Sequence, residues 1–235
     1  MLPIGDTIPR RETPIATWTL IAVNVIVFLV EISLPKQTLG WVFYHFGLVP
    51  ARYADPHFRA WFGPTADSVW PFLTNMLLHG SWMHLIGNMW ALSIFGGSVE
   101  DRMGHVQFVS FYMLTGIAAS LTHYVTNLHS TIPALGASGA IAGVMGAYLL
   151  LFPTAQVITL IPLGFIPLFV PIPSLIFFGA WFLTQLFAGV HALIAPEFGG
   201  GIAWWAHIGG MMAGMALLPV FYRRRQGFRD GIYSN

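Results

Sequence analysis

The sequence predicts an all-α, polytopic membrane protein that crosses the bilayer six times. Hydrophobic residues make up 56% of its 235 residues and charged residues only 8%. Soluble globular domains carry about 25% charged residues, so this chain cannot cover its own surface with solvated groups. The charges are also unevenly placed, because no Asp, Glu, Lys or Arg lies between Met103 and Pro196. A charge at the bilayer centre costs roughly 3 kcal/mol or more, which explains such a gap in a membrane-embedded chain.

Six segments are long and apolar enough to span a membrane, or nearly so, at about 20 residues per helix. In chain order they are Ile15–Leu34, Trp82–Val99, His105–Asn127, Ser138–Phe152, Ser174–Leu193 and Ile202–Phe221. The first segment is too long for a signal-peptide core, so we expect an anchor helix. The apolar stretch Val157–Pro173 contains four prolines, which interrupt helices. We therefore expect a connector that lies against the membrane rather than a seventh span.

Lys and Arg between the spans predict the orientation of the chain. With a cytoplasmic N-terminus, the inner segments hold the larger group: Arg10, Arg11, Arg102, Arg223, Arg224, Arg225 and Arg229. The outer segments hold Lys36, Arg52 and Arg59, all in the long first loop. We therefore predict one membrane-embedded domain, residues 1–235, with a helical core of about residues 15–222 and both termini in the cytoplasm.

The composition also excludes several classes of protein. Ten Lys and Arg balance nine Asp and Glu, so there is no basic surface for nucleic acid. The sequence has no Cys, which excludes disulfides, thiolate metal sites and a cysteine nucleophile. A metal site of His79, His84 and His207 is the weaker interpretation, because no carboxylate lies near them in the sequence. We expect neither a metal ion nor a cofactor.

Polar side chains occur near the start of three spans, where burial in a membrane makes them costly. His84 and Asn88 are four residues apart in the second span, so they share one helix face, and His79 precedes them. Ser138 begins the fourth span, and His207 lies at the start of the sixth. Because these three spans run in the same predicted direction, all five groups fall at one depth near the outer face.

Small residues follow both Ser138 and His207. The fourth span continues with Ala140, Ala142, Gly143, Gly146 and Ala147, and the sixth carries Ala206, Gly210 and Gly214 at intervals of four. Small residues at this spacing let membrane helices approach closely. We therefore expect these two spans to touch, with Ser138 and His207 as a nucleophile and its general base.

Each of these features, taken singly, has a plainer interpretation. A serine in a membrane helix usually bonds its own backbone, and a glycine stripe usually means packing. The convergence of Ser138, two histidines and an asparagine on three parallel helices favours catalysis. No Asp or Glu lies in the third to sixth spans, so a Ser-His-Asp triad is disfavoured and we expect packing to orient His207.

Four motifs resemble those of the rhomboid intramembrane serine proteases, over about residues 70–214. The motifs are His79-Gly80-Ser81-Trp82-Met83-His84 followed by Asn88, Glu100-Asp101-Arg102-Met103-Gly104, Gly136-Ala137-Ser138-Gly139, and Ala206-His207-Ile208-Gly209-Gly210 with Gly214. Two departures from the family are Pro71, where many members have Arg after a Trp, and Ala142, where some members have an aromatic residue that stacks on the histidine.

The resemblance implies a six-helix rhomboid-like bundle with a catalytic dyad, in which Ser138 is the nucleophile and His207 the general base. The other implied roles are an oxyanion site of Asn88, His84 and the Ser138 backbone N–H, close approach at Gly136 and Gly139, and a structural place for His79 near the active-site floor.

The implied function is that of an intramembrane serine endopeptidase that cleaves single-span membrane proteins in or near their transmembrane segments. Its active site would face the outer side of the bilayer, and a compact six-helix chain fits the bacterial cytoplasmic (inner) membrane. The alternatives are a catalytically silent rhomboid-like binder of transmembrane helices and a small transporter. Retention of Ser138 and His207 disfavours the first, and the lack of paired repeats in the sequence disfavours the second.

Overall fold

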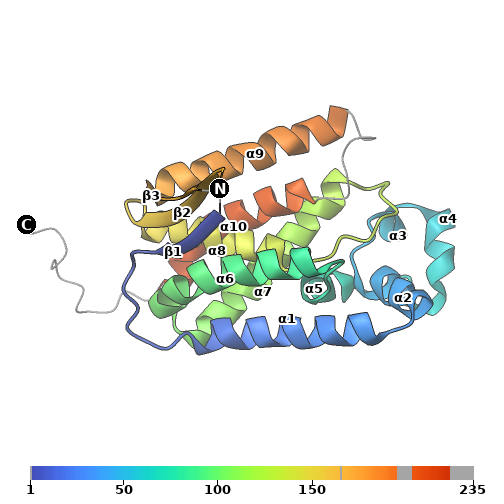
Figure 1. The fold of residues 1–235 in the computed structure, drawn as a ribbon. Helices are drawn as coiled ribbons and strands as arrows, with labels where there is room; N and C mark the ends of the chain where they lie inside the picture. Colours follow the sequence, from blue (N-terminus) through green and yellow to red (C-terminus); the bar gives the residue numbers. More distant parts are fainter. Residues whose placement is uncertain (1, 165, 195–202, 223–235) are drawn as a thin grey trace, which may run out of the picture.

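The structure is a computed structural model that describes residues 2–164, 166–194 and 203–222. Its long helices follow the order of the predicted spans (Figure 1): α1 (Ile15–Ser33), α6 (Trp82–Met103), α7 (His105–Thr126), α8 (Ser138–Leu151), α9 (Ser174–Ile194) and α10 (Trp204–Phe221). Within the described ranges, α1, α7, α9 and α10 are both long and apolar enough to cross a membrane, and α8 is apolar but shorter. The all-α polytopic fold is therefore confirmed, while six spans remain a prediction. Ile202 and the predicted cytoplasmic arginines 223–225 and 229 lie outside the described residues.

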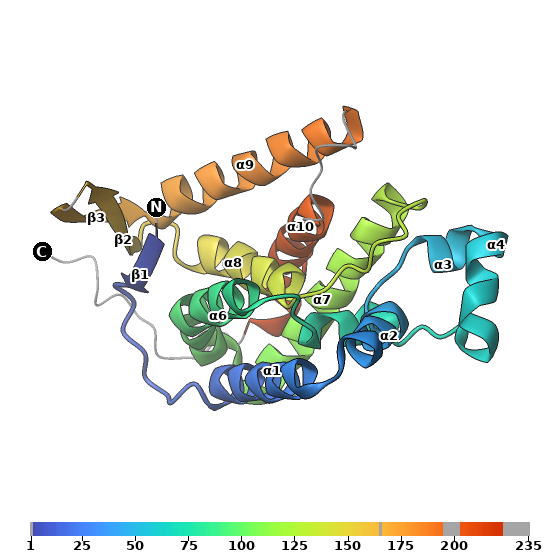
Figure 2. The same cartoon turned by 45° about the vertical axis from the view of Figure 1, so that its right-hand side comes forward.

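Helix α8 lies at the centre of the bundle, where α6, α7, α9 and α10 contact it (Figure 2). Every residue from Gly139 to Leu149 is buried. A helix that is apolar all round is typical of a protein core or of a membrane span. Helices α1 and α9 lie on opposite outer sides of the molecule. The first residue of α8, Ser138, is half-buried.

Glycines bring α8 and α10 into direct backbone contact. A Cβ atom added at Gly210 would lie 2.0 Å from the carbonyl oxygen of Gly139, and one added at Gly214 would lie 2.0 Å from that of Gly143. From the other side, a Cβ at Gly146 would lie 2.4 Å from a carbonyl oxygen of α10. No side chain fits at these positions. The close contact that the small residues predict is therefore present in the structure.

Glu100 joins the first three long helices. Its carboxylate accepts hydrogen bonds from the backbone N–H of Ala16 (2.8 Å) and Thr17 (2.7 Å) and from the Thr17 hydroxyl (2.6 Å). It thereby caps the N-terminus of α1, whose first N–H groups have no partner within the helix. The same carboxylate contacts the imidazole of His105 at the start of α7. Gly104 turns the chain between α6 and α7 with a φ of 85°.

The long first loop is folded into short helices. These are α2 (Lys36–Phe46), α3 (Ala51–Ala54), α4 (Pro56–Arg59), η1 (Ala60–Thr65), α5 (Pro71–Thr74) and η2 (Asn75–Leu77). The fully buried Arg52 braces this loop, because its guanidinium donates hydrogen bonds to the carbonyl oxygens of His45, Thr65 and Ala66. A buried charge requires such partners. The loop is therefore braced although Pro71 stands where many family members have Arg.

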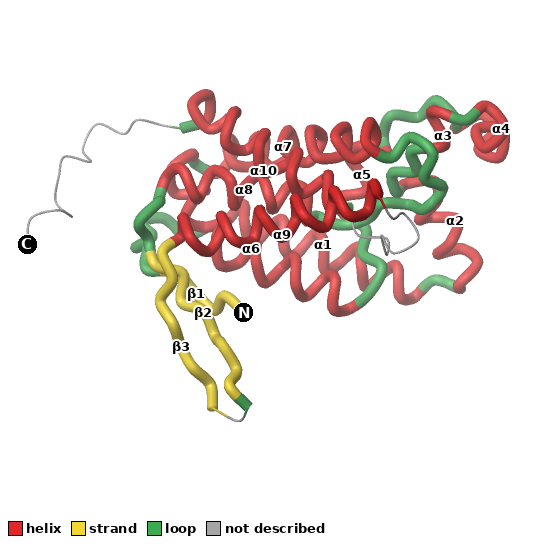
Figure 3. Tube along the Cα trace, turned by 90° about the horizontal axis from the view of Figure 1, so that it is seen from above, coloured by secondary structure: helices red, strands yellow, loops and turns green. Residues whose placement is uncertain are grey.

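The predicted connector after α8 forms a β-hairpin, which the sequence analysis did not anticipate. Strand β2 (Gln156–Leu163) pairs antiparallel with β3 (Ile166–Pro173), and β1 (Leu2–Asp6) pairs antiparallel with the other edge of β2. Figure 3 shows the hairpin projecting from the end of the helix bundle. Most of its prolines lie in β3, an edge strand whose outer N–H groups need no partner in the sheet.

We expect Gly214→Ala to destabilise the protein by about 3 kcal/mol or more, because the new methyl group collides with backbone that cannot rotate away. The measurement is thermal unfolding of the purified protein in detergent. Gly179→Ala is the matched control, since a Cβ at this α9 position has nothing within 4 Å. Equal melting temperatures for the two variants would contradict the close contact.

Candidate active site

Ser138 and His207 form a direct hydrogen bond. Ser138 Oγ lies 2.8 Å from His207 Nε2, although the two residues are 69 positions apart. Ser138 is the first residue of α8, and His207 lies in the first turn of α10. The glycine contact between these helices brings the two side chains together. A hydroxyl beside an imidazole nitrogen is the arrangement of a nucleophile and its general base.

The other ring nitrogen of His207 contacts a residue that was not predicted from the sequence. His207 Nδ1 lies 2.7 Å from Oε1 of Gln185 on α9, and Gln185 is buried. The Trp181 ring lies nearby, with its centroid 5.8 Å from that of the imidazole. The expectation that packing orients His207 was therefore incomplete. A polar amide within an apolar span was the signal that could have identified Gln185.

Gly136 places the chain before Ser138 against the side chains of His84 and Asn88. It has a φ of 116°, a conformation that favours glycine. A Cβ at Gly136 would lie 2.5 Å from His84 Nε2 and 3.4 Å from Asn88 Nδ2. Both predicted oxyanion donors therefore border the backbone two residues before the serine.

The N-terminus of α8 has no side-chain cap among the described residues. The backbone N–H of Ile141 is bonded to the carbonyl oxygen of Ala137, so the N–H groups of the first three helical residues have no partner within the helix. Gly139 allows this end to approach α7, because a Cβ there would lie 2.6 Å from the Cβ of Ala119. The start of α8 thus presents free N–H groups and the positive end of a helix dipole beside Ser138.

His79 supports Asn88 rather than touching Ser138. Its Nε2 accepts a hydrogen bond from Asn88 Nδ2 (3.0 Å), and its backbone N–H donates to Oε2 of the buried Glu31 on α1 (3.2 Å). His79 lies in the turn before α6. Burial, reinforced by the neighbouring His84, lowers the pKa of the His79 imidazole to about 4, so the ring stays neutral. Glu31 is a second residue that was not predicted from the sequence.

The backbone leading to Ser138 is tied to the first loop. Leu48 and Ala134 exchange two backbone hydrogen bonds of 3.0 and 2.8 Å, and the N–H of Gly136 donates to the carbonyl oxygen of Asn75 (2.9 Å). These bonds fix the segment that carries the nucleophile.

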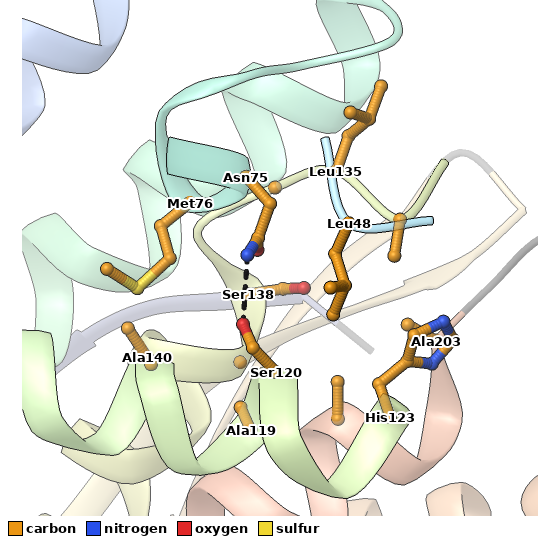
Figure 4. A pocket seen from close by; sticks show the side chains of 15 residues that line it. Leu48, Asn75, Met76, Ala119, Ser120, His123, Leu135, Ser138, Ala140 and Ala203 are labelled. Atoms are coloured by element: carbon orange, nitrogen blue, oxygen red, sulfur yellow. Dashed lines mark hydrogen bonds between the residues drawn. The ribbon is translucent and has the colours of Figure 1, made fainter. Parts of the chain in front are cut away.

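A small cavity lies beside Ser138 (Figure 4). The Asn75 amide donates to the Ser120 hydroxyl (2.9 Å) at its wall, and the buried His123 also lines it. Four of its lining side chains are polar, those of Asn75, Ser120, His123 and Ser138, and such groups can bind a water molecule. Among the described residues, no group of three or more His, Asp or Glu is arranged to hold a metal ion.

The Rhomboid domain family matches residues 66–224, which include every residue of this site except Glu31 and Leu48. The chain belongs to the rhomboid family. With its apolar helices, this membership makes it an integral membrane protein, and the family includes a relative that is named as a protease.

The chain is similar to several rhomboid proteins. "Rhomboid protein 1, mitochondrial" of Saccharomyces cerevisiae is 35% identical over 142 residues, which are 58% of this chain and 37% of that protein. "Rhomboid protease GlpG" of Haemophilus influenzae is 28% identical over 150 residues, which are 63% of this chain and 68% of that protein. The matched part covers less than half the length of the yeast protein and of rhomboid-like relatives from Arabidopsis thaliana and Mus musculus.

We expect the His79→Gln variant to lose part of the acid sensitivity of the folded protein. The imidazole has a pKa of about 4 in the folded protein and 6.5 in the unfolded chain, so as the pH falls the unfolded chain binds the proton at a higher pH. His79 therefore contributes stability above pH 6.5 that is lost as the pH falls towards 4, about 2 kcal/mol of it by pH 5. Glutamine keeps an acceptor for Asn88 but does not titrate.

The measurement is the difference in melting temperature between pH 7 and pH 5, in detergent. His129→Gln, at an exposed position, is the matched control. If His79→Gln and the control keep the same acid sensitivity as the unmodified protein, the proposed burial of a neutral His79 is wrong.

Proposed function

We propose that this rhomboid-family protein is an intramembrane serine endopeptidase with a Ser138–His207 dyad. The observation that supports this most directly is the 2.8 Å contact between Ser138 Oγ and His207 Nε2. As Oγ bonds to the carbonyl carbon of a peptide, Nε2 takes its proton and then donates it to the leaving amine. A water molecule, activated by the same nitrogen, then hydrolyses the ester on Ser138.

The groups around Gly136 would stabilise the negative charge that develops on the carbonyl oxygen. Asn88 donates one amide hydrogen to His79, which leaves the second for the oxyanion. His84 Nε2 borders the same backbone, and the N–H of Ser138 lies at the uncapped start of α8. Donors fixed before the reaction are effective, since the loss of one typically costs about 3–4 kcal/mol in the transition state.

We propose single-span transmembrane proteins as substrates. A transmembrane helix hides its carbonyl groups in hydrogen bonds, so the cleaved segment must unwind before Ser138 can attack. Helix-weakening or small residues near the end of the substrate span would favour this step. The bacterial relative named as a protease supports this class of activity. A catalytically silent binder of transmembrane helices would not need the contact between Ser138 and His207.

We also propose the bacterial cytoplasmic (inner) membrane as the location, with both termini in the cytoplasm and the active site towards the outer face. The distribution of Lys and Arg supports this orientation. Some relatives are named as mitochondrial, so cell fractionation is the experiment that tests which membrane contains the protein.

We expect Ser138→Ala to abolish cleavage of a tagged single-span protein and labelling by a fluorophosphonate, because the attacking oxygen is removed. Melting temperature in detergent should change little, since one hydroxyl is lost. Ser110→Ala is the matched control, at an exposed position on α7. Undiminished cleavage by purified Ser138→Ala protein would exclude Ser138 as the nucleophile, and a wild-type protein that neither cleaves nor takes up the label would favour the silent binder.

We expect leucines introduced around the cleavage site of a substrate to slow its hydrolysis, because they stabilise the helix that must unwind. The initial rate is compared with that for the same substrate carrying leucines at the opposite end of its span. Equal rates for both substrates would argue against unwinding as a limiting step.

A further inference from the structure

We infer that Gln185 is a positioning residue that fixes the tautomer and the ring orientation of His207. The inference rests on the proposed function, because it explains how the imidazole becomes a base. It is supported by the 2.7 Å contact between Oε1 of Gln185 on α9 and Nδ1 of His207 on α10. Neither residue has an acidic neighbour in the apolar spans that form this part of the bundle.

The orientation of the Gln185 amide follows from its other contacts. Its Nε2 lies 3.4 Å from the carbonyl oxygen of Trp181 and 3.1 Å from Oγ1 of Thr184. The Thr184 hydroxyl donates its own hydrogen to the same Trp181 carbonyl (2.6 Å), so its lone pairs face the amide. Both neighbours therefore accept hydrogen bonds from the amide nitrogen. The carbonyl oxygen of Gln185 is left to face His207.

This orientation selects one form of the imidazole. Oε1 can only accept a hydrogen bond, so Nδ1 of His207 must carry the proton. In a neutral imidazole Nε2 then has the free lone pair, and this nitrogen is the one that faces Ser138. The opposite tautomer would point an N–H at the serine and could not take its proton.

An amide suits this place better than a carboxylate. Gln185 is 6% exposed, and the unpaired charge of an acid there would be costly to bury. The neutral amide supplies the acceptor without that charge. It provides the orienting function that an acid performs in a Ser-His-Asp triad.

Because the contact between Gln185 and His207 joins two helices, the tautomer of His207 depends on the packing of α9 against α10. One turn after Gln185, a Cβ at Gly189 would lie 3.5 Å from Trp204 Cβ and 3.2 Å from the indole of Trp205. Glycine thus lets α9 lie close to the first turn of α10, within reach of the ring. The dyad is oriented when these two helices are in contact.

The test compares Gln185→Met, which keeps the size but removes the acceptor, with Gln185→Glu, which keeps an acceptor. Gln107→Met is the matched control, because Gln107 lies near the other end of α7, roughly 20 Å along the helix from the cavity residue Ser120. We measure kcat and KM on a single-span substrate in detergent, and ¹⁵N NMR spectra of the histidine-labelled full chain. The His207 signals are assigned by their loss in His207→Phe.

We expect Gln185→Met to lower kcat between about 10-fold and 10³-fold, less than the roughly 10⁴-fold loss known for a triad histidine held in the wrong tautomer. KM should stay within twofold, Gln185→Glu should recover at least tenfold in kcat over Gln185→Met, and Gln107→Met should match wild type. The wild-type spectrum should show a proton on Nδ1 of His207, and Gln185→Met should lose that single form.

A kcat for Gln185→Met within twofold of wild type, a change in KM alone, or a wild-type His207 without a proton on Nδ1 would overturn the inference. If Gln185→Met does not fold, the wild-type spectrum decides: a proton on Nδ1 of His207 supports the inference, and its absence overturns it. Failure of the proposed function looks different: the wild type would show no Ser138-dependent cleavage, while the spectrum would still report whether Gln185 holds the ring.

Discussion

The backbone contact between α8 and α10 is the constraint on which the site depends. Ser138 Oγ and His207 Nε2 lie on separate helices and meet at 2.8 Å where small residues let the two backbones approach closely. Gly210 and Gly214 allow that approach, because their missing side chains leave room for carbonyl oxygens of α8. Lipid gives helices no hydrophobic reason to associate, so this close packing must itself stabilise the pair.

Polar contacts from distant parts of the chain converge around this pair. The first loop holds the backbone before Ser138 through Leu48 and Asn75, and α1 reaches the same region through the contact of Glu31 with His79. Each contact satisfies a polar group that would be costly to leave unpaired in an apolar environment. The segments that carry Ser138 and Asn88 are thereby held by the rest of the bundle.

The sequence predicted the helices well because apolar length and the absence of charge depend on local composition alone. The residues around Ser138 and His207 were also predictable, since motif spacing and helix direction place them at one depth. The β-hairpin was not predicted: its prolines argue against a helix, but pairing with residues 2–6 is a contact between segments about 150 positions apart. The brace by Arg52 was missed for a different reason: its acceptors are backbone carbonyls, which every residue carries.

By itself, the sequence determined the membrane class, the order of the long helices and the residues of the candidate site, because these follow from composition, periodicity and spacing. Only the tertiary structure decided how His207 is held. Gln185 is one polar residue in an apolar span, 22 positions from His207, and nothing local indicates which way its amide turns. That direction depends on how α9 packs beside α10, a relation between two surfaces that no single stretch of sequence contains.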